Sequence, residues 1–198
     1  GLYVGAGGEL RCNSLTLTNG AALAVLAAMR AYPSSALVTT ITGALVKVAG
    51  DLFVGANSTV YVINTVRPNT GVSNINLVPV YFEAENVMVQ DQARFDADYT
   101  GHPGSSGRQA KTLGNGAGAG SGRGFAPYNS YAASHGGLAS GAPASKIYGV
   151  DTVPVFPGSG GGAVFGNASG GPGGGAVRIK AHKNLQLDGA LSANGRAG

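Results

Sequence analysis

Carboxylates are the side chains of this sequence best suited to chemistry. Glu83 and Glu85 alternate on one face of a predicted strand, and Asp91, Asp96 and Asp98 follow in the segment "QDQARFDADY". Two carboxyl groups about 5 to 10 Å apart can act as acid and base on a glycosidic bond. Converging carboxylate oxygens can instead bind calcium, although the glycine and terminal glutamate of an EF-hand loop are missing here. We favour a third interpretation, in which these residues face solvent on strands whose other face is apolar.

A cluster of aromatic residues is the second candidate site. The segment "FAPYNSYAASHGG" contains Tyr128, Tyr131 and His135 within the glycine-rich half of the chain. A tyrosine ring can pack on a sugar while its hydroxyl forms hydrogen bonds, and the same residues are common at subunit contacts. The alternative, which we favour, is that the rings anchor glycine-rich segments to the rest of the protein.

Most other catalytic and cofactor-binding motifs fail on spacing. Lys111 is preceded by Ala110 where a phosphate-binding loop needs glycine, and no serine has the flanking glycines of a nucleophile elbow. His102, His135 and His182 lie far apart in the sequence and are expected at the surface. The single cysteine, Cys12, excludes an internal disulfide and a cysteine-based zinc site, and we expect it to be a small buried residue. We therefore predict no cofactor, and an enzyme only under the carboxylate alternative.

Two sequons offer possible modification sites. They are Asn57-Ser58-Thr59 and Asn167-Ala168-Ser169, and both lie in predicted turns. Asn57 and Asn167 would accept glycans if the protein comes from a secreting eukaryote.

The composition points to a surface or fibrous protein. Of 198 residues 35 are glycine, and only 11% are charged, whereas average proteins contain about 7% glycine and 25% charged residues. The net charge of +4 comes from scattered lysines and arginines, so nucleic-acid binding is not predicted. No apolar stretch reaches the roughly 18 residues that span a bilayer. We expect an extracellular or cell-surface protein without a membrane span.

Alternating apolar residues predict strands in the first hundred residues. "SLTLTNGAALAV" (14–25) and "ALVKVAGDLFVGANSTVYVI" (44–63) both alternate and contain turn residues. Gly20–Tyr32 also has helical spacing, so a short helix remains an alternative to a strand there.

Two internal repeats indicate stacked units. Leu2–Leu10 aligns with Leu52–Val60, and Asn86–Asp98 aligns more loosely with Asn184–Asn194, the first copy being two residues longer. Units of strand, tight turn and strand must stack to bury an apolar face.

The last thirty residues resemble a known family. The segment "GGPGGGAVRIKAHKNLQLDGALSANGRAG" (170–198) is similar to the glycine-rich parallel β-helix repeats of large secreted and surface, adhesin-like polypeptides. The resemblance rests on the glycine run and on the phrase "LQLDGALSANG". It implies an extracellular protein with a structural or adhesive role.

Together these features predict an all-β fold, a right-handed parallel β-helix (β-solenoid) with a long glycine-rich insertion. Residues 1–100 would form coils, 101–175 the insertion packed on them, and 176–198 a further coil of a longer chain. The stretch "GNGAGAGSGRG" (114–124) would pack closely against another backbone, because glycines allow close approach. We expect a structural or adhesive subunit of an extracellular filament or appendage, with copies of itself as partners through its ends or flanks. The alternative is a tailspike-like protein that binds or degrades polysaccharides, the latter through Glu85, Asp91, Asp96 and Asp98.

Overall fold

The computed structural model describes residues 1–5, 7–28, 43–65, 80–102, 104, 124–125, 129–130, 157–161 and 170–196. Every regular element in these ranges is a β-strand, as predicted from the alternating pattern. None of these residues belongs to a helix that is long and apolar enough to cross a membrane.

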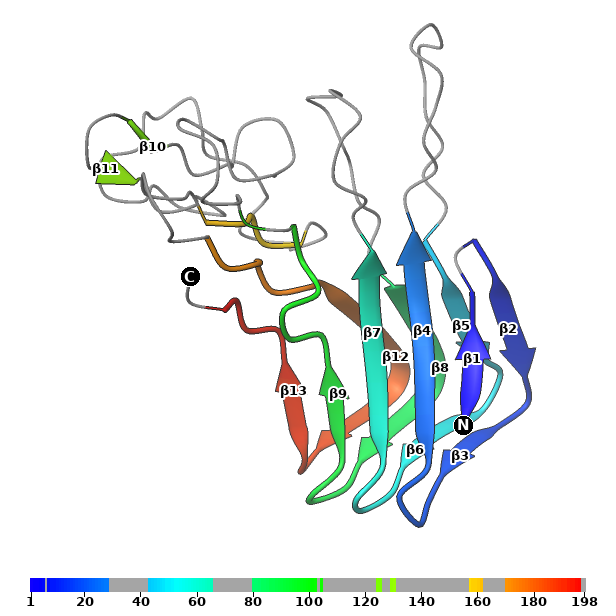
Figure 1. Ribbon diagram of the computed structural model, residues 1–198. Coiled ribbons are helices and arrows are strands. Elements are labelled where there is room, and N and C mark those ends of the chain that lie inside the picture. Colours follow the sequence, from blue (N-terminus) through cyan, green and yellow to red (C-terminus); the bar gives the residue numbers. More distant parts are fainter. Residues whose placement is uncertain are drawn as a thin grey trace, which may run out of the picture.

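Five parallel strands form the first sheet, in the spatial order β1-β4-β7-β9-β13. Their bounds are Leu2–Val4 (β1), Ala22–Ala28 (β4), Thr59–Thr65 (β7), Arg94–Asp96 (β9) and Ala190–Ser192 (β13). One row of side chains crosses this whole sheet through Leu2, Leu23, Val60, Phe95 and Leu191. Figure 1 shows the sheet with β1 and β13 as its outer strands.

A second parallel sheet lies behind the first (Figure 1). It contains β2 (Glu9–Cys12), β3 (Leu15–Leu17), β5 (Leu45–Val48), β6 (Asp51–Val54), β8 (Val80–Val89) and β12 (Val177–Leu187). The long strand β8 pairs with β5 through its first half and with β6 through its second half. Strand β12 pairs with β8 along the other edge. A short antiparallel pair, β10 (Gly124–Phe125) with β11 (Asn129–Ser130), is separate from both sheets.

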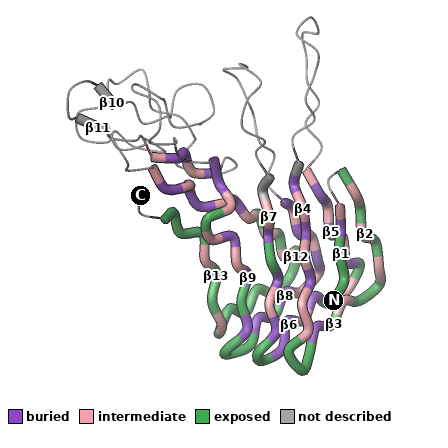
Figure 2. The backbone as a smooth tube through the Cα atoms, viewed as in Figure 1, coloured by how far each residue is buried: buried purple, intermediate pink, exposed green. Residues whose placement is uncertain are grey.

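Both sheets bury alternate side chains in one shared core. Buried and more exposed residues alternate along the strands in Figure 2, and a single apolar cluster draws members from both sheets. At its centre Phe82 of β8 meets Phe95 of β9 edge to face, with ring centroids 5.1 Å apart and both side chains fully buried. Burying one such side chain contributes about 1.5 to 3 kcal/mol, so this contact holds the sheets together.

The predicted right-handed parallel β-helix is wrong. The described strands form two curled parallel sheets around one core and not the coils of a β-solenoid. The prediction relied on the repeat that aligns Leu2 with Leu52. In the structure Leu2 lies beside Leu23 in the first sheet, whereas Leu52 lies beside Leu15 in the second. The two copies resemble each other because both form alternating strands, and they do not stack.

The second predicted repeat is confirmed by the strand register. Asn184 lies beside Asn86, and Ser192 lies beside Asp96. The first copy is longer because the turn from β8 into β9 has more residues than the turn from β12 into β13. These pairs place strands of the predicted units 1–100 and 176–198 in the same sheets, while most of 101–175 lies outside the described residues.

Gly20–Tyr32 contains a strand and not the alternative helix. Strand β4 occupies Ala22–Ala28, and its alternation of buried and half-buried residues continues that of β3. Residues 29–42 lie outside the described ranges.

Tight turns connect the second sheet to the first at one end of the molecule. Asn19, Asn57 and Gln92 occupy these turns with φ values of 56°, 63° and 62°. This left-handed conformation is unfavourable for most residues, although asparagine adopts it more readily. The backbone N–H of Asn57 donates to the carbonyl of Gln92 at 3.2 Å, so neighbouring turns stack as the strands do.

Glycine-rich segments pack closely beyond the carboxyl end of β9. The N–H of Gly101 donates to the carbonyl of Gly173, and the N–H of Gly158 donates to that of Gly174, both at 2.8 Å. A Cβ added at Gly101, Gly173 or Gly174 would lie 1.9 to 2.2 Å from a carbonyl oxygen of another segment. Only glycine fits such an approach. Glycine-rich segments at Gly101, Gly158 and Gly173 therefore pack closely, whereas 114–123 of the stretch predicted to do so lie outside the described residues.

Candidate functional site

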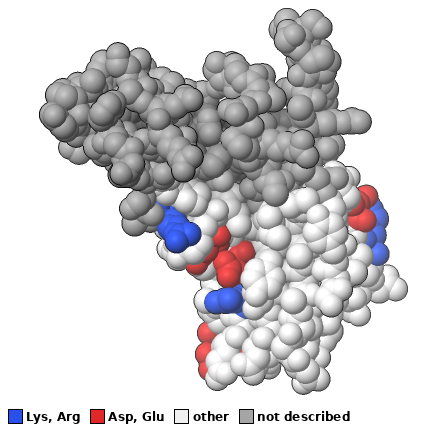
Figure 3. Space-filling model, viewed as in Figure 1, with Lys and Arg blue, Asp and Glu red and all other residues white. Residues whose placement is uncertain are grey.

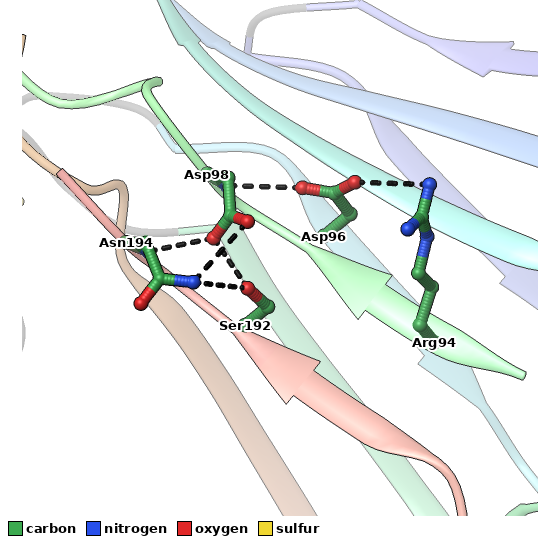
Figure 4. A network of polar contacts seen from close by, with 5 residues as sticks. All are labelled: Arg94, Asp96, Asp98, Ser192 and Asn194. Atoms are coloured by element: carbon green, nitrogen blue, oxygen red, sulfur yellow. Dashed lines mark hydrogen bonds and ion pairs between the residues drawn. The ribbon is translucent and has the colours of Figure 1, made fainter. Parts of the chain in front are cut away.

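The three candidate aspartates are not gathered into one site. Asp91 is exposed in the turn that precedes β9, whereas Asp96 and Asp98 lie together at the carboxyl end of β9. The backbone N–H of Asp98 donates to the Asp96 carboxylate at 3.0 Å. The guanidinium of Arg94 lies 3.4 Å from the second Asp96 oxygen (Figure 4).

The end of β13 and the residues just after it supply the partners of Asp98. The Ser192 hydroxyl and the Asn194 backbone N–H, the latter at 2.6 Å, donate to Oδ1 of Asp98, and the Asn194 side-chain amide donates to Oδ2 at 3.3 Å. These donors, the Ser192 hydroxyl first, hold the pKa of Asp98 below its ordinary value. An acid that stays ionised is a poor proton donor at neutral pH. Asp98 therefore suits a polar link between β9 and β13.

The calcium alternative finds no cluster of ligands in the described ranges, and the catalytic alternative stays untested. No three histidine, cysteine, aspartate or glutamate side chains converge there. Glu85, the fourth catalytic candidate, lies on β8 in the other sheet, where the Lys183 ammonium lies 3.0 Å from its carboxylate.

A second polar cluster lies on the outer face of β5, β8 and β12. The Glu83 carboxylate lies 2.8 Å from Nε2 of His182 and 3.4 Å from Nζ of Lys47. The hydrogen bond with His182 and the interactions with Lys47 lower the pKa of Glu83, although partial desolvation opposes them.

Of the histidines predicted at the surface, His182 is exposed. His102, predicted at the surface, is instead fully buried, because it lies among the closely packed glycine-rich segments. Its backbone N–H donates to the Gly158 carbonyl.

An open groove of about 570 Å³ crosses the outer face of β3, β6, β8 and β12. A row of polar side chains runs along it: Asn184 Nδ2 donates to Asn86 Oδ1 at 2.8 Å, and Asn86 Nδ2 donates to Asp51 Oδ1 at 2.7 Å. Phe53 and Met88 form a parallel apolar row two residues further along each strand. Hydrogen-bonding groups beside an aromatic ring can bind a sugar chain.

Sequence reasoning missed this groove although a signal was present. Asp51-Leu52-Phe53, Asn86-Val87-Met88 and Asn184-Leu185-Gln186 share a polar residue followed by an inward apolar one. Aligning all three phrases would have brought Asp51, Asn86 and Asn184 into one row.

The remaining candidates lie mostly outside the described residues. Tyr128, Tyr131, His135 and Asn167 all do so, and their roles stay predictions. Asn57 is exposed in its turn, a position that leaves its side chain accessible for glycosylation.

On the face of the described residues that Figure 3 shows, charged side chains are sparse. Figure 3 shows them gathered over β9 and β13 and along β2, with wide uncharged areas between.

Comparison with family models, curated proteins and solved structures finds no significant match to this chain. Its function is therefore argued from the geometry of the sheets and their side chains.

Proposed function

We propose that this chain is a structural or adhesive subunit of an extracellular filament or surface appendage and assembles from copies of itself. The observation that carries the proposal is the open state of both sheet ends. In the part of the chain that the structure describes, β1, β2 and β3 at one end and β12 and β13 at the other each pair along one edge only. Unpaired edges present free N–H and C=O groups to another chain.

Large apolar side chains accompany these open edges. Leu2 is 45% exposed at one end, and Leu185, Leu187 and Leu191 are 57%, 44% and 50% exposed at the other. Each belongs to a row whose inner members are buried, so among the described residues the exposure comes from the edge position of the strand and not from the direction of the side chain. Apolar edges of this kind favour association.

The composition supports the extracellular placement. Low charge and abundant glycine depart from the average composition and suit a surface or fibrous protein.

Sedimentation velocity over increasing protein concentration, followed by electron microscopy, tests the proposal. We expect species larger than the monomer to grow with concentration and elongated particles to appear. Leu185→Lys should weaken this assembly, because it puts a charge on an exposed end. Met88→Lys is the matched control, since Met88 is 39% exposed but lies on the outer face of the sheet. A sharp monomer at the highest concentration, without fibres, would contradict the proposal.

Glycan binding in the groove is a second candidate function. It is favoured by the Asp51, Asn86 and Asn184 row beside the Phe53 ring. A glycan array should then show binding that Phe53→Ala reduces at least tenfold and Tyr61→Ala, on the other sheet, leaves unchanged. An array without any bound glycan would remove this candidate.

A further inference from the structure

We propose that a second copy of this chain docks head to tail, with its β1, β2 and β3 placed beside β13 and β12 in the register that the strands keep inside the molecule. This inference rests on the proposed self-assembly and specifies its interface. It commits to one pair of surfaces: the end formed by β12 and β13 and the opposite end formed by β1, β2 and β3 (Figure 1).

The strand directions allow this arrangement. All pairings inside the two sheets are parallel among the described strands. A copy translated along the sheets would therefore add further parallel strands, and both sheets would continue through the junction. Two identical ends meeting about a twofold axis would instead bring antiparallel strands together.

The apolar rows of the two ends correspond in the first sheet. Leu191 continues the row of Phe95, Val60 and Leu23, and Leu2 is the first member of that row. Docking in register would place Leu2 of the second copy beside Leu191. Both side chains are about half exposed in the single chain and would be covered together.

The second sheet shows the same correspondence. Leu185 and Leu187 continue rows that begin at Leu15 and Leu17 and pass through β6 and β8. Leu15 of the second copy would lie beside Leu185, and Leu17 beside Leu187. A shift of one residue would turn these side chains to the opposite face, and a shift of two would leave one leucine of each strand without its partner, so the apolar rows favour this register.

The charged side chains of β2 and β12 complement each other at one position. Glu9 leads a row through Leu45 and Tyr81 to Arg178, so Glu9 of the second copy would lie beside Arg178. The next outward row brings Arg11 beside Lys180. These two cations have Glu9 and Glu83 as close neighbours, since Glu9 pairs with Arg11 at 2.6 Å and Lys180 lies next to Glu83 on β8.

Disulfide trapping tests the register. Thr16 and Gln186 are exposed and occupy the two ends of one row through Phe53 and Met88. In a background with Cys12→Ala, a chain carrying both Thr16→Cys and Gln186→Cys should form a reducible ladder of covalent oligomers on mild oxidation. Adjacent strands lie about 4.8 Å apart, within the Cα separation of a disulfide.

The matched control pairs Thr16→Cys with Lys180→Cys. Lys180 is also exposed on β12, but it lies six residues from Gln186, roughly 20 Å along the strand. This pair should give no ladder.

The outcomes separate this inference from the proposed function. A ladder with the first pair alone supports head-to-tail docking. Dimers from Gln186→Cys alone would show contact between identical ends and overturn it, as would assembly into fibres without either cross-link. Both of those results leave self-assembly standing, whereas a chain that stays monomeric at all concentrations overturns the inference together with the proposed function.

Discussion

Asp98 joins two strands that lie far apart in the sequence. Its carboxylate accepts hydrogen bonds from the Ser192 hydroxyl and from two Asn194 groups, and its own N–H donates to Asp96. Because the donors stabilise the ionised form, folding lowers the pKa of Asp98. The link between β9 and β13 is therefore sensitive to acid.

Replacing Asp98 by asparagine should flatten the acid dependence of stability. A group whose pKa is lowered on folding stabilises the protein above its unfolded pKa, near 3.8, and loses that contribution as pH falls through its folded pKa. Urea unfolding of the wild type should therefore show a free energy of unfolding that declines below about pH 4, and Asp98→Asn should decline less. At pH 7 the variant should be less stable by about 1 kcal/mol, because charge-assisted hydrogen bonds are lost.

Asp91→Asn is the control for this experiment, since Asp91 is exposed in the turn before β9. Identical pH profiles for Asp98→Asn and the wild type would contradict the role assigned to Asp98.

Gln92 adopts a left-handed backbone conformation that costs glutamine more free energy than it costs asparagine, which occupies the stacked turn at Asn57. Both residues have φ near 60° in stacked turns, and asparagine is enriched in this conformation. Gln92→Asn should raise the free energy of unfolding by a few tenths of a kcal/mol to about 1 kcal/mol. Asn57→Gln should lower it by a similar amount. Chemical denaturation of the wild type and both variants checks these predictions. If both variants had the stability of the wild type, the turns would not discriminate between asparagine and glutamine.

The glycine-rich segments are stabilised by contacts that leave no space for a side chain. Gly174 has its backbone against Ala193, and an added Cβ would lie 1.9 Å from the Ala193 carbonyl oxygen. Gly174→Ala should therefore destabilise the protein by about 1 to 3 kcal/mol or displace the segment. Gly161→Ala should have little effect, because the nearest atom to its Cβ would be 3.6 Å away. Thermal unfolding of both variants tests this, and an unaffected Gly174→Ala would refute close packing as the reason for glycine here.

Alternation and turn residues were sufficient to predict the strands but not the way they pair. "SLTLTNGAALAV" was correctly interpreted as strand, turn and strand, now β3 and β4. The register could not be inferred from one short similarity, since Leu2–Leu10 and Leu52–Val60 resemble each other without stacking. The longer similarity of Asn86–Asp98 to Asn184–Asn194 succeeded because it includes both strands and the turn between them.

The candidate site was predicted only in part, for the same reason. Asp96 and Asp98 were recognised as polar residues beside apolar ones, but their partners Ser192 and Asn194 come from a strand nearly a hundred residues later. The proximity of Asp96, Asp98 and Asp91 in the sequence suggested one site, whereas the turn before β9 separates Asp91 from the other two. Side chains that meet across parallel strands leave little trace in local spacing.

The whole molecule has two different ends, which makes its proposed contact heterologous. A heterologous contact between identical chains propagates into filaments unless the rotation closes a ring. Because only folded chains can dock, the free energy of unfolding should rise with protein concentration, by up to about 1.4 kcal/mol for each tenfold increase in free partner. The unfolding midpoint should rise with it. Differential scanning calorimetry of the wild type and Leu185→Lys checks this. The variant should show little concentration dependence, and a wild-type midpoint that is constant over two decades would contradict the contact.

The connections that follow β4, β7 and β9 all leave the first sheet at the same end, opposite the tight turns. Each starts and finishes at strands whose register is fixed by their neighbours. The loop-closure entropy of such a connection grows only logarithmically, so that doubling its length costs about 0.6 kcal/mol. Lengthening the chain after β4 or β7 should therefore cost little stability, and in a head-to-tail assembly the carboxyl ends of these strands would line up along one side of successive subunits.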